Sequence, residues 1–550
     1  MSRLVCLALL LACCGWLGAQ NDPEVNAAMA RDDVAVWPQS SMVRVLPGEP
    51  APAAAPRTIE LSLARGEYES AQVLIRTGPG TSLQDVRVEL SELLHANGTA
   101  SIGEADLEWY QVGFVRIEKP DKTPSIPARW LDTGWYPDPL LPVESFSVAE
   151  GFTQPIWVTV HAPRQAEAGD YTGTVTVKAK GGTLARVPLS VHVYDFELAP
   201  GAGHLRTAFS LGERPILRLY EGDRQMLYRW QDYMLDRLRL NPFDLWLQTP
   251  PPLDRLKALN ARGMNAFPLA YLPNDKEATE WPFAPSPEKT RALLEDLRPT
   301  VDELRRLGLL KKAYLFGGDE VPAKRVEATK ASFALVQETY PDVTLMTTAH
   351  VPQTEDDLRG FHLDALCPMW DWGEFERLEG LRKAGFEMWA YISLQPYAPF
   401  PNWRMDNDLM QARTIFWQVY HQKFDAFLYW ALILADRPGN DKLIDPADGP
   451  FLSWSISTSE PDGWIPWLHG DGRMLYAGTD GPIGSIRLDN IRDGLEDYEY
   501  LWLLSDATGD AEAGREACIP VASGLDKFTG DPQVLRRERD HIAQQIEGAG

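Results

Sequence analysis

The sequence predicts two folds in series, an N-terminal antiparallel β-sandwich followed by a (β/α)8 TIM-type barrel. The chain has 550 residues, which is too long for one ordinary hydrophobic core. Its first part contains short strands separated by turn residues, and its second part alternates strand-like runs with amphipathic helices. We expect domains at 20–200 and 201–507, preceded by a signal peptide at 1–19 and followed by a helical tail at 508–550.

The first segment, "MSRLVCLALLLACCGWLGAQ", is typical of a secretory signal peptide. It has an early arginine, an apolar centre from Leu4 to Ala12 and small residues near Ala19. It is too short to span a bilayer, and no other run approaches the roughly 20 apolar residues of a membrane span. We predict cleavage after Ala19 and a secreted or periplasmic protein. A lipoprotein box at 10–13, "LLAC", leaves a lipid anchor as the alternative.

Residues 32–200 show the alternation of half-buried strands. The run 58–78, "TIELSLARGEYESAQVLIRTG", alternates apolar and polar residues on both sides of a turn at Arg65–Gly66. A second pair of strands flanks Gly181–Gly182, which predicts a hairpin. Several such strands with regular turns indicate a sandwich, and "APGAGH" at 199–204 is the expected linker.

After the linker, strand-like runs alternate with helical stretches. Eight runs with seven helix-bearing connections match the number that closes a (β/α)8 barrel. Their apolar character fits strands buried on both faces. The runs are 206–212, 241–248, 264–272, 311–319, 342–350, 363–371, 387–395 and 425–433. The stretch 485–504 then predicts a long helix, which we expect to be the eighth helix of the barrel.

The fourth run ends in "GGDE", which places Asp319 and Glu320 at the carboxyl end of a barrel strand. Catalytic groups of such barrels lie at this end. Gly317 and Gly318 allow the backbone to turn, so both carboxylates can reach one pocket. The other interpretation is a polar turn that merely ends a strand.

Aromatic residues at the later strand ends favour a site for a sugar, whose C–H face packs on rings while its hydroxyls need polar partners. The candidate substrate-binding residues at these ends are Trp370, Asp371, Trp372, Tyr391 and Trp430. For Trp389 and Tyr429, which alternate with their neighbours along the strands, we expect core packing at least as much as a place in the site.

The runs "YLFGGDE", "WAYISLQPYAPFPNW", "FLYW", "GDGRMLYAG" and "PIGSIRLDNIRDGLEDYEYLWLL" resemble the catalytic domain of glycoside hydrolase family 123, formerly domain of unknown function 4091. "ARGEYESAQVLIR" and "GWYPDPLLP" resemble its N-terminal domain. The resemblance implies a retaining β-N-acetylhexosaminidase, of the kind that removes β-linked N-acetylgalactosamine. The family's catalytic pair would fall on Asp319 and Glu320.

In that mechanism the substrate's 2-acetamido oxygen is the nucleophile, so the enzyme needs no nucleophile of its own. Glu320 would act as general acid and then as general base, and is expected to be protonated at rest. Asp319 would be ionised, bind the acetamido N–H and stabilise the cationic intermediate. Tyr391 is a candidate donor to the acetamido oxygen. Arg492, Glu496 and Asp497 fit the family's helical motif, and we interpret them as structural charges that form ion pairs or face water.

Composition restricts the partners. With 53 basic and 78 acidic residues the net charge is −25, which argues against nucleic acid or an anionic membrane as partner and fits an uncharged glycan. No CxxC or HExxH motif occurs, so we expect no metal and no cofactor. Cys367 and Cys518 follow the signal peptide and need not pair.

Three alternatives remain open at this stage. The first is a glycosidase of different specificity with an ordinary carboxylate nucleophile, for which Asp371 is the first candidate. The second is a secreted, non-catalytic carbohydrate-binding protein with a degenerate barrel. The third comes from "GGDEV", which resembles the GGDEF motif of diguanylate cyclases, although a secreted barrel is the wrong context for nucleotide chemistry.

Overall fold

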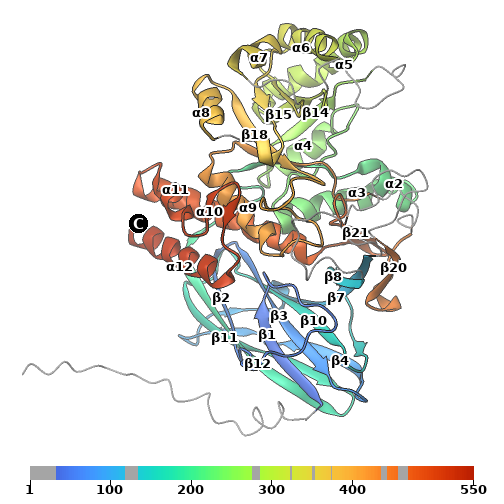
Figure 1. The fold of residues 1–550 in the computed structure, drawn as a ribbon, viewed down its shortest axis with the longest axis vertical. Helices are drawn as coiled ribbons and strands as arrows, with labels where there is room; N and C mark the ends of the chain where they lie inside the picture. Colours follow the sequence, from blue (N-terminus) through green and yellow to red (C-terminus); the bar gives the residue numbers. More distant parts are fainter. Residues whose placement is uncertain are drawn as a thin grey trace, which may run out of the picture.

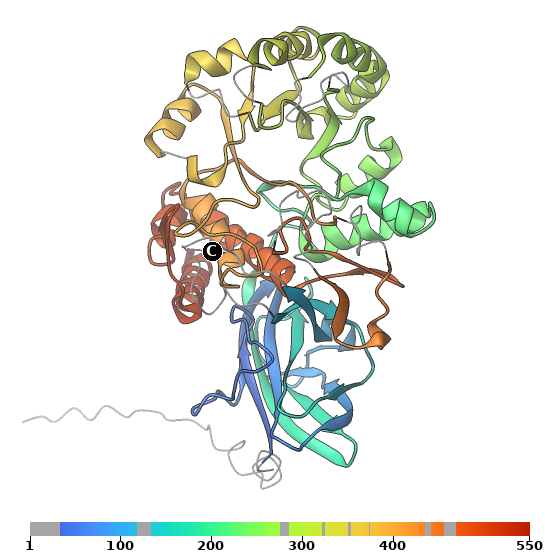
Figure 2. The ribbon, with the colours of Figure 1, turned by 45° about the vertical axis from the view of Figure 1, so that its right-hand side comes forward.

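The computed structural model describes residues 33–117, 134–274, 285–321, 325–349, 354–372, 375–434, 442–455 and 469–549, and at 372, 375–377 and 453–455 it describes the backbone only. The predicted signal peptide lies outside these residues. A β-rich N-terminal part is stacked against a larger α/β part, with α10 and α12 near the boundary between them (Figures 1 and 2).

The N-terminal part consists of two sheets. The first contains β1 (Val34–Ser40), β3 (Tyr68–Thr77), β10 (Thr153–His161), β7 (Leu107–Ile117), β8 (Gly134–Leu141) and β20 (Phe451–Ser455). The second contains β2 (Ile59–Arg65), β12 (Gly182–Glu197), β11 (Gly169–Ala179), β4 (Leu83–Leu90), β9 (Phe146–Val148), β5 (Leu93–His95) and β6 (Ser101–Ile102). Buried residues of both sheets, such as Val73 and Val187, pack into one apolar core, as expected for a sandwich.

Most strand pairs of the sandwich are antiparallel, as predicted, and two are parallel. The hairpin between β11 and β12 has the predicted turn, with Ala179 opposite Gly182. The parallel pairs are β2 with β12, and β20 with β7. The second pair is formed by a strand that lies after the barrel in the sequence, so the two parts of the molecule share a sheet.

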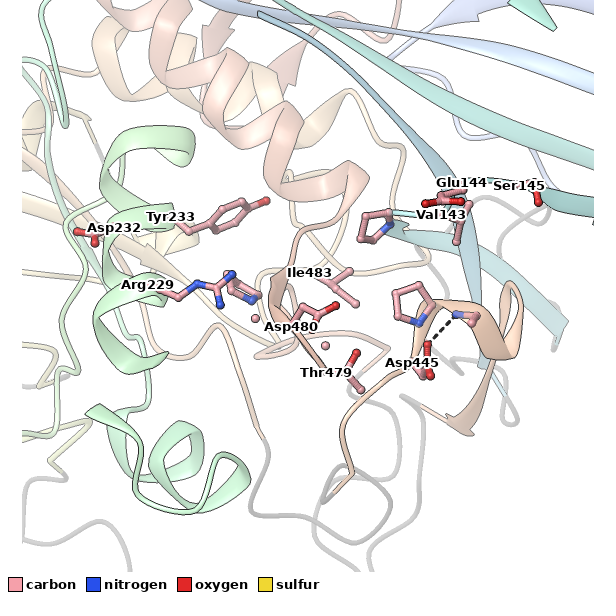
Figure 3. Close-up of a pocket in the computed structure, with 16 residues that line it drawn as sticks. Val143, Glu144, Ser145, Arg229, Asp232, Tyr233, Asp445, Thr479, Asp480 and Ile483 are labelled. Atoms are coloured by element: carbon pink, nitrogen blue, oxygen red, sulfur yellow. Dashed lines mark hydrogen bonds between the residues drawn. The ribbon is translucent and has the colours of Figure 1, made fainter. Parts of the chain in front are cut away.

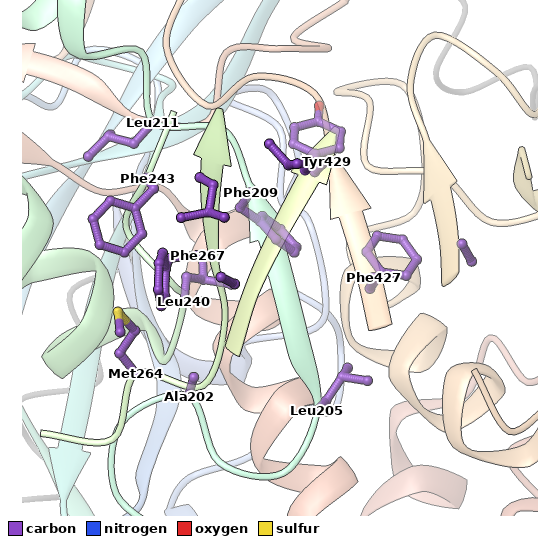
Figure 4. Packing of buried hydrophobic residues seen from close by; sticks show 14 of the residues in the cluster. Ala202, Leu205, Phe209, Leu211, Leu240, Phe243, Met264, Phe267, Phe427 and Tyr429 are labelled. Atoms are coloured by element: carbon purple, nitrogen blue, oxygen red, sulfur yellow. The ribbon is translucent and has the colours of Figure 1, made fainter. Parts of the chain in front are cut away.

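The second part contains seven parallel strands in the order β13-β19-β18-β17-β16-β15-β14. Their inward side chains form a buried cluster that includes Tyr314, Phe316 and Trp389, while outward side chains such as Phe209 and Phe427 pack beneath the helices (Figure 4). The strands are β13 (Arg206–Phe209), β14 (Phe267–Tyr271), β15 (Ala313–Phe316), β16 (Thr344–Thr347), β17 (Ala365–Leu366), β18 (Glu387–Ile392) and β19 (Ala426–Tyr429).

The sequence predicted eight barrel strands, and the run 241–248 is not a regular strand. It nevertheless lies between the two edge strands, because Leu211 N–H donates to the Phe243 carbonyl (3.1 Å) and Tyr271 N–H donates to the Leu247 carbonyl (2.7 Å). The Asp244 carboxylate accepts the N–H of Trp246 (3.0 Å), a local turn that interrupts the extended backbone. The sheet is therefore barrel-like and nearly closed.

Helices follow most of the strands. They are α2 (Glu213–Leu219), α3 (Arg224–Asp232), α4 (Leu253–Asn260), α5 (Pro287–Arg306), α6 (Val326–Thr339), α7 (Glu355–Gly360), α8 (Phe375–Lys383), α9 (Gln411–His421), α10 (Ile486–Thr508), α11 (Ala513–Cys518) and α12 (Pro532–Ala549). A π-helical turn, Tyr233–Arg237, extends α3. Short 3-10 helices lie at Glu104–Asp106, Leu310–Lys312, Trp370–Trp372 (η6) and Pro446–Asp448. There are also two small hairpins among the described residues. One pairs β21 (Tyr476–Gly478) with β22 (Gly481–Ile483), and the other pairs β23 (Ala522–Gly524) with β24 (Lys527–Phe528).

Helix α10 confirms the helix expected at 485–504. It begins after Ser485, whose hydroxyl accepts the N–H of Leu488 (3.2 Å), and it ends at Gly509, where φ is +67°. Most of its first sixteen residues are buried because α9 covers one side and the N-terminal sheet the other. Arg492, Glu496 and Asp497 are fully buried and ion-paired, so they are structural but do not face water.

Candidate active site

The turn after β15 presents the two acids. Gly318 has φ +66° and Glu320 has φ +46°, so two of three consecutive residues adopt a left-handed backbone conformation. A β-carbon on Gly317 would lie 2.8 Å from Leu272, and one on Gly318 would lie 3.1 Å from Thr329, so both positions require glycine. Glutamate rarely adopts a positive φ, and such backbone outliers cluster at functional sites. This turn brings the two adjacent carboxyl groups within hydrogen-bond distance of hydroxyls at neighbouring strand ends, those of Thr348 and Tyr391.

Both acids are tied to neighbouring strands. The hydroxyl of Thr348, which follows β16, donates to Oδ1 of Asp319 (2.8 Å) and accepts the N–H of Glu320 (3.3 Å). The hydroxyl of Tyr391, on β18, donates to Oε1 of Glu320 (2.9 Å). The predicted residues Asp319, Glu320 and Tyr391 are thus together at the carboxyl end of the sheet.

The electrostatics of Asp319 differ from the expectation that this residue is ionised at rest. Burial raises the pKa of Asp319 to about 7, the Thr348 hydroxyl opposes this shift, and the charge of Glu320 adds to it. Burial and the nearby Glu320 carboxylate also raise the pKa of Tyr391 well above its usual value, so its hydroxyl keeps its proton. In the free protein, Asp319 therefore takes up a proton around neutral pH.

An aromatic group beside the acids was missed at the sequence level. Trp246 lies with its ring 5.0 Å from that of Tyr271 and 5.5 Å from that of Phe316, and it remains partly exposed. Burial and, to a smaller extent, the charge of Asp319 raise the pKa of Tyr271, whose ring Trp246 contacts. Trp246 was detectable, because it lies near the carboxyl end of the predicted strand 241–248, where the same reasoning selected Trp430.

The candidate substrate-binding residues that follow β17 are not held next to Asp319 and Glu320 as Tyr391 is. Trp370 is buried in the outer core, with its ring 5.5 Å from that of Phe424, and its indole N–H donates to the carbonyl of Leu525 (3.2 Å). Asp371 is exposed on η6. The side chain of Trp372 lies outside the described part of the structure.

Of the aromatic residues of β18 and β19, Trp389 and Tyr429 were expected to pack in the core at least as much as to belong to the site. Trp389 and Tyr429 are buried, the first inside the barrel and the second beneath the helices. Trp430 directly follows β19 and stays partly exposed at the carboxyl end. Its indole N–H donates to both carboxylate oxygens of Asp471, at 3.1 Å each.

A separate cavity of about 740 Å³ lies between the N-terminal sheet, α3 and the β21–β22 hairpin (Figure 3). Its lining includes Val143, Arg229, Tyr233, Asp445 and Asp480. Neither acid of the candidate site is among its lining residues.

Among the described residues, no three histidine, cysteine, aspartate or glutamate side chains are placed to ligate one metal ion. Cys367 and Cys518 are both free and buried. In the part of the chain that the structure describes, every helix is too short or too polar to cross a lipid bilayer.

A parallel, nearly closed barrel with two carboxyl groups and aromatic rings at its carboxyl end fits a glycosidase. The family models agree. The model of the glycoside hydrolase 123 catalytic domain matches residues 263–504, and that of the glycoside hydrolase 123 N-terminal domain matches residues 48–179. Together they cover more than half of the sequence. The chain belongs to glycoside hydrolase family 123 and is a glycoside hydrolase.

The fold is similar to that of a family 123 glycoside hydrolase from Clostridium perfringens described in connection with glycolipid glycan hydrolysis. The identity is 12%, 94% of this chain and 97% of that chain are covered, and the TM-score is 0.64. A family 39 glycoside hydrolase from Bacteroides cellulosilyticus WH2 overlaps more weakly, at 10% identity, 79% and 81% coverage and a TM-score of 0.32, too low to inform the fold. No curated protein sequence matches the chain.

Proposed function

We propose that this protein is a secreted, retaining β-N-acetylhexosaminidase that removes β-linked N-acetylgalactosamine from a glycan by substrate-assisted catalysis. One observation carries the proposal: Asp319 and Glu320 are adjacent in sequence and are held side by side by Thr348. An ordinary retaining glycosidase places its two carboxyl groups on opposite sides of the bond, about 5–5.5 Å apart, with one as nucleophile. Adjacent acids suit a reaction in which the substrate supplies the nucleophile.

Each residue then has one role. The acetamido oxygen attacks the anomeric carbon, the glycosidic bond breaks, and Glu320 gives its proton to the departing oxygen. Asp319 accepts the acetamido N–H and its charge stabilises the cationic ring that forms. Water then attacks the anomeric carbon and gives a proton to Glu320, while the bond between that carbon and the acetamido oxygen breaks and the acetamido group is restored.

Tyr391 orients the Glu320 carboxyl group in this proposal and does not donate to the acetamido oxygen of the substrate. Its hydroxyl already donates to Oε1 of Glu320, so the proton that Glu320 transfers would be carried on Oε2. The ring of Trp246 beside Tyr271 and the ring of Trp430 supply apolar surfaces for the sugar. We propose further that the segment 241–248 takes the eighth place in the barrel.

The substrate class is supported by family membership and by the relative from Clostridium perfringens, whose description concerns glycolipid glycans. The proposal of secretion rests on the apolar segment 4–12 and the small residues before Gln20. Sequencing the mature protein from its native host should give an N-terminus at Gln20.

The test compares two p-nitrophenyl β-galactosides, one with a 2-acetamido group and one with a 2-hydroxyl. The first should be hydrolysed with retention of configuration and the second scarcely touched. Glu320→Gln should abolish hydrolysis of the 2-acetamido substrate, whereas Asp371→Asn should retain it. Preference for the 2-hydroxy substrate, together with loss of activity in Asp371→Asn, would establish an ordinary nucleophile instead.

A further inference from the structure

A buried carboxylate, that of Asp471, lies next to the partly exposed Trp430 at the end of β19. Asp471 is almost completely buried and accepts three hydrogen bonds, one from the Tyr429 hydroxyl (2.8 Å) and two from the Trp430 indole N–H (3.1 Å to each oxygen). The Tyr429 hydroxyl in turn accepts the N–H of Gly472 (2.9 Å). These contacts fix the direction of the Trp430 side chain at the end of β19.

The backbone around Asp471 is shaped for this contact. Gly470 has φ +86° and Gly472 has φ +70°, a region that side-chain-bearing residues avoid. A β-carbon on Gly472 would lie 2.7 Å from Cζ2 of Trp430, and one on Gly470 would lie 2.9 Å from Nη1 of Arg487. The segment 469–475 therefore lies against the indole ring on one side and against α10 on the other.

Arg487 joins this segment to the N-terminal domain. Its guanidinium donates to the carbonyls of Gly470 and Trp403 (2.9 Å each) and to that of Arg473. The same guanidinium makes a two-pronged ion pair with Asp138 of β8, at 2.9 and 2.8 Å. Asp138 and Arg487 are almost completely buried, and such two-pronged pairs fix geometry as well as contribute energy.

Trp430 directly follows β19, at the carboxyl end of the sheet, which is the end at which the acids lie. It comes two residues after Leu428, whose side chain is inside the barrel and whose backbone is paired with Tyr391. Tyr391 is the residue that holds Glu320. Trp430 is therefore at the same end of the sheet as the acids, just beyond the strand that pairs with the strand of Tyr391, and its partly buried ring also packs against the outer core.

We propose that Asp471 is a positioning residue that orients Trp430 as a wall of the glycan site, and that Asp138 of the N-terminal domain holds the segment 469–475 in place through Arg487. The N-terminal sandwich is then part of what shapes the substrate site. This inference rests on the proposed function only in requiring that Trp430 contacts the sugar.

The first measurement is a comparison of KM and kcat on p-nitrophenyl 2-acetamido-2-deoxy-β-galactoside with the full-length protein. Asp471→Ala should raise KM about tenfold, the loss of one well-placed contact, with a smaller effect on kcat. Asp471→Asn, whose amide oxygen still accepts the indole N–H, should recover most of this loss. A wild-type KM in a folded Asp471→Ala protein would overturn the proposal.

The second measurement asks whether Asp471 acts through Trp430. Trp430→Phe keeps an aromatic ring and lacks the N–H, so adding Asp471→Ala to it should raise KM no further. Independent effects that multiply in the double variant would contradict the assignment. Calorimetric binding of N-acetylgalactosamine in the Glu320→Gln background repeats the comparison without turnover.

The third measurement tests the link to the sandwich. Asp138→Asn should raise KM like Asp471→Ala and add little to it, whereas Asp195→Asn, an exposed carboxylate of the same domain, should not change KM. If Asp138→Asn lowers the melting temperature and leaves KM at the wild-type value, the link is refuted. Hydrolysis that survives Glu320→Gln would instead refute the proposed function. The KM comparisons could still be interpreted in that case, because they do not depend on the role of Glu320.

Discussion

At the scale of single residues, the proposed mechanism depends on ionisation of the Asp319 carboxyl group. Burial and the neighbouring Glu320 raise its pKa to about 7, and the Thr348 hydroxyl is the contact that opposes them. A substrate amide N–H placed against Asp319 would act in the same direction as Thr348, since a donor stabilises the charged form. Substrate binding and ionisation of Asp319 are therefore coupled.

The pH profile should reveal this coupling. Because the proposed mechanism uses ionised Asp319, kcat/KM should fall as the pH drops below about 7, the folded-state pKa. Thr348→Val removes the hydroxyl that opposes the rise in the Asp319 pKa, so the fall of kcat/KM at low pH should begin at a higher pH in this variant. Thr348→Ser keeps a hydroxyl and should give the same low-pH side of the profile as wild type. Profiles of the three proteins on the 2-acetamido substrate measure the shift. Identical limbs for valine and wild type would exclude Thr348 from this role.

The same raised pKa affects stability. A carboxyl group whose pKa is higher in the folded than in the unfolded state loses stabilisation as the pH rises from its unfolded value towards about 7. Asp319→Asn cannot ionise, so the variant should melt at a higher temperature than wild type at pH 8 and at nearly the same temperature at pH 4. Melting curves at both pH values test the sign. An equal offset at both values would point to a packing effect instead.

At the scale of elements, the sequence predicted the strands well and their side-chain directions less well. Seven of the eight predicted barrel runs contain a strand of the observed sheet, because continuous apolar runs between turn residues are a strong signal. The exception, 241–248, is broken by the Asx turn at Asp244, a contact that depends on one side chain. Strand-end position correctly brought Asp319, Glu320 and Tyr391 together.

The parts of the site that were missed depend on strand neighbours. Thr348 reaches the acids because β16 pairs with β15, which periodicity alone does not specify. Trp370 was expected to face the substrate, but β17 has two residues and gives way to η6, so alternation could not be extended to it. Sequence reasoning therefore placed the two acids and Tyr391 at one strand-end site and failed on the surrounding contacts that strand pairing creates.

Helix α10 offers a test of close packing between elements. A β-carbon on Gly494 would lie 2.6 Å from the Phe416 ring and 2.7 Å from the Arg413 carbonyl, both on α9. Gly494→Ala should therefore destabilise the protein by about 1–3 kcal/mol, although alanine is the better helix former. Gly380→Ala in α8 has open space around it and should stabilise by about 0.5–1 kcal/mol. Denaturant unfolding compares the two, and a stabilised Gly494→Ala would show that the helices can separate without cost.

At the scale of the whole molecule, buried charges join the two parts. Arg413 of α9 pairs with Glu69 of the sandwich (2.9 Å to each oxygen) and with Asp497 of α10 (2.7 and 2.8 Å). Arg539 of α12 pairs with Glu67 of the sandwich. Such pairs contribute less through attraction than they cost when one partner is removed, since the remaining charges stay buried.

Arg413→Met should accordingly destabilise the protein by about 3–5 kcal/mol, because Glu69 and Asp497 would lose the guanidinium that hydrogen-bonds to both and would keep only their ion pairs with Arg539. The exposed pair between Arg305 and Asp342 is the matched control, and Arg305→Met should cost about 1 kcal/mol or less. Chemical unfolding of both variants measures the difference. Equal costs would show that water reaches the buried pair.

Strand β20 completes the N-terminal sheet but is synthesised only after the barrel strands. Phe451 rests on Phe114 of the N-terminal sheet, with ring centroids 5.5 Å apart, and Pro450 accepts the N–H of Phe114 (2.6 Å). A nascent chain therefore leaves the ribosome with this stretch of β7 uncapped until the barrel strands have also emerged. An open strand edge recruits other chains, so a recombinant fragment ending near residue 200 should accumulate as aggregate even though every residue of its own inner core is present.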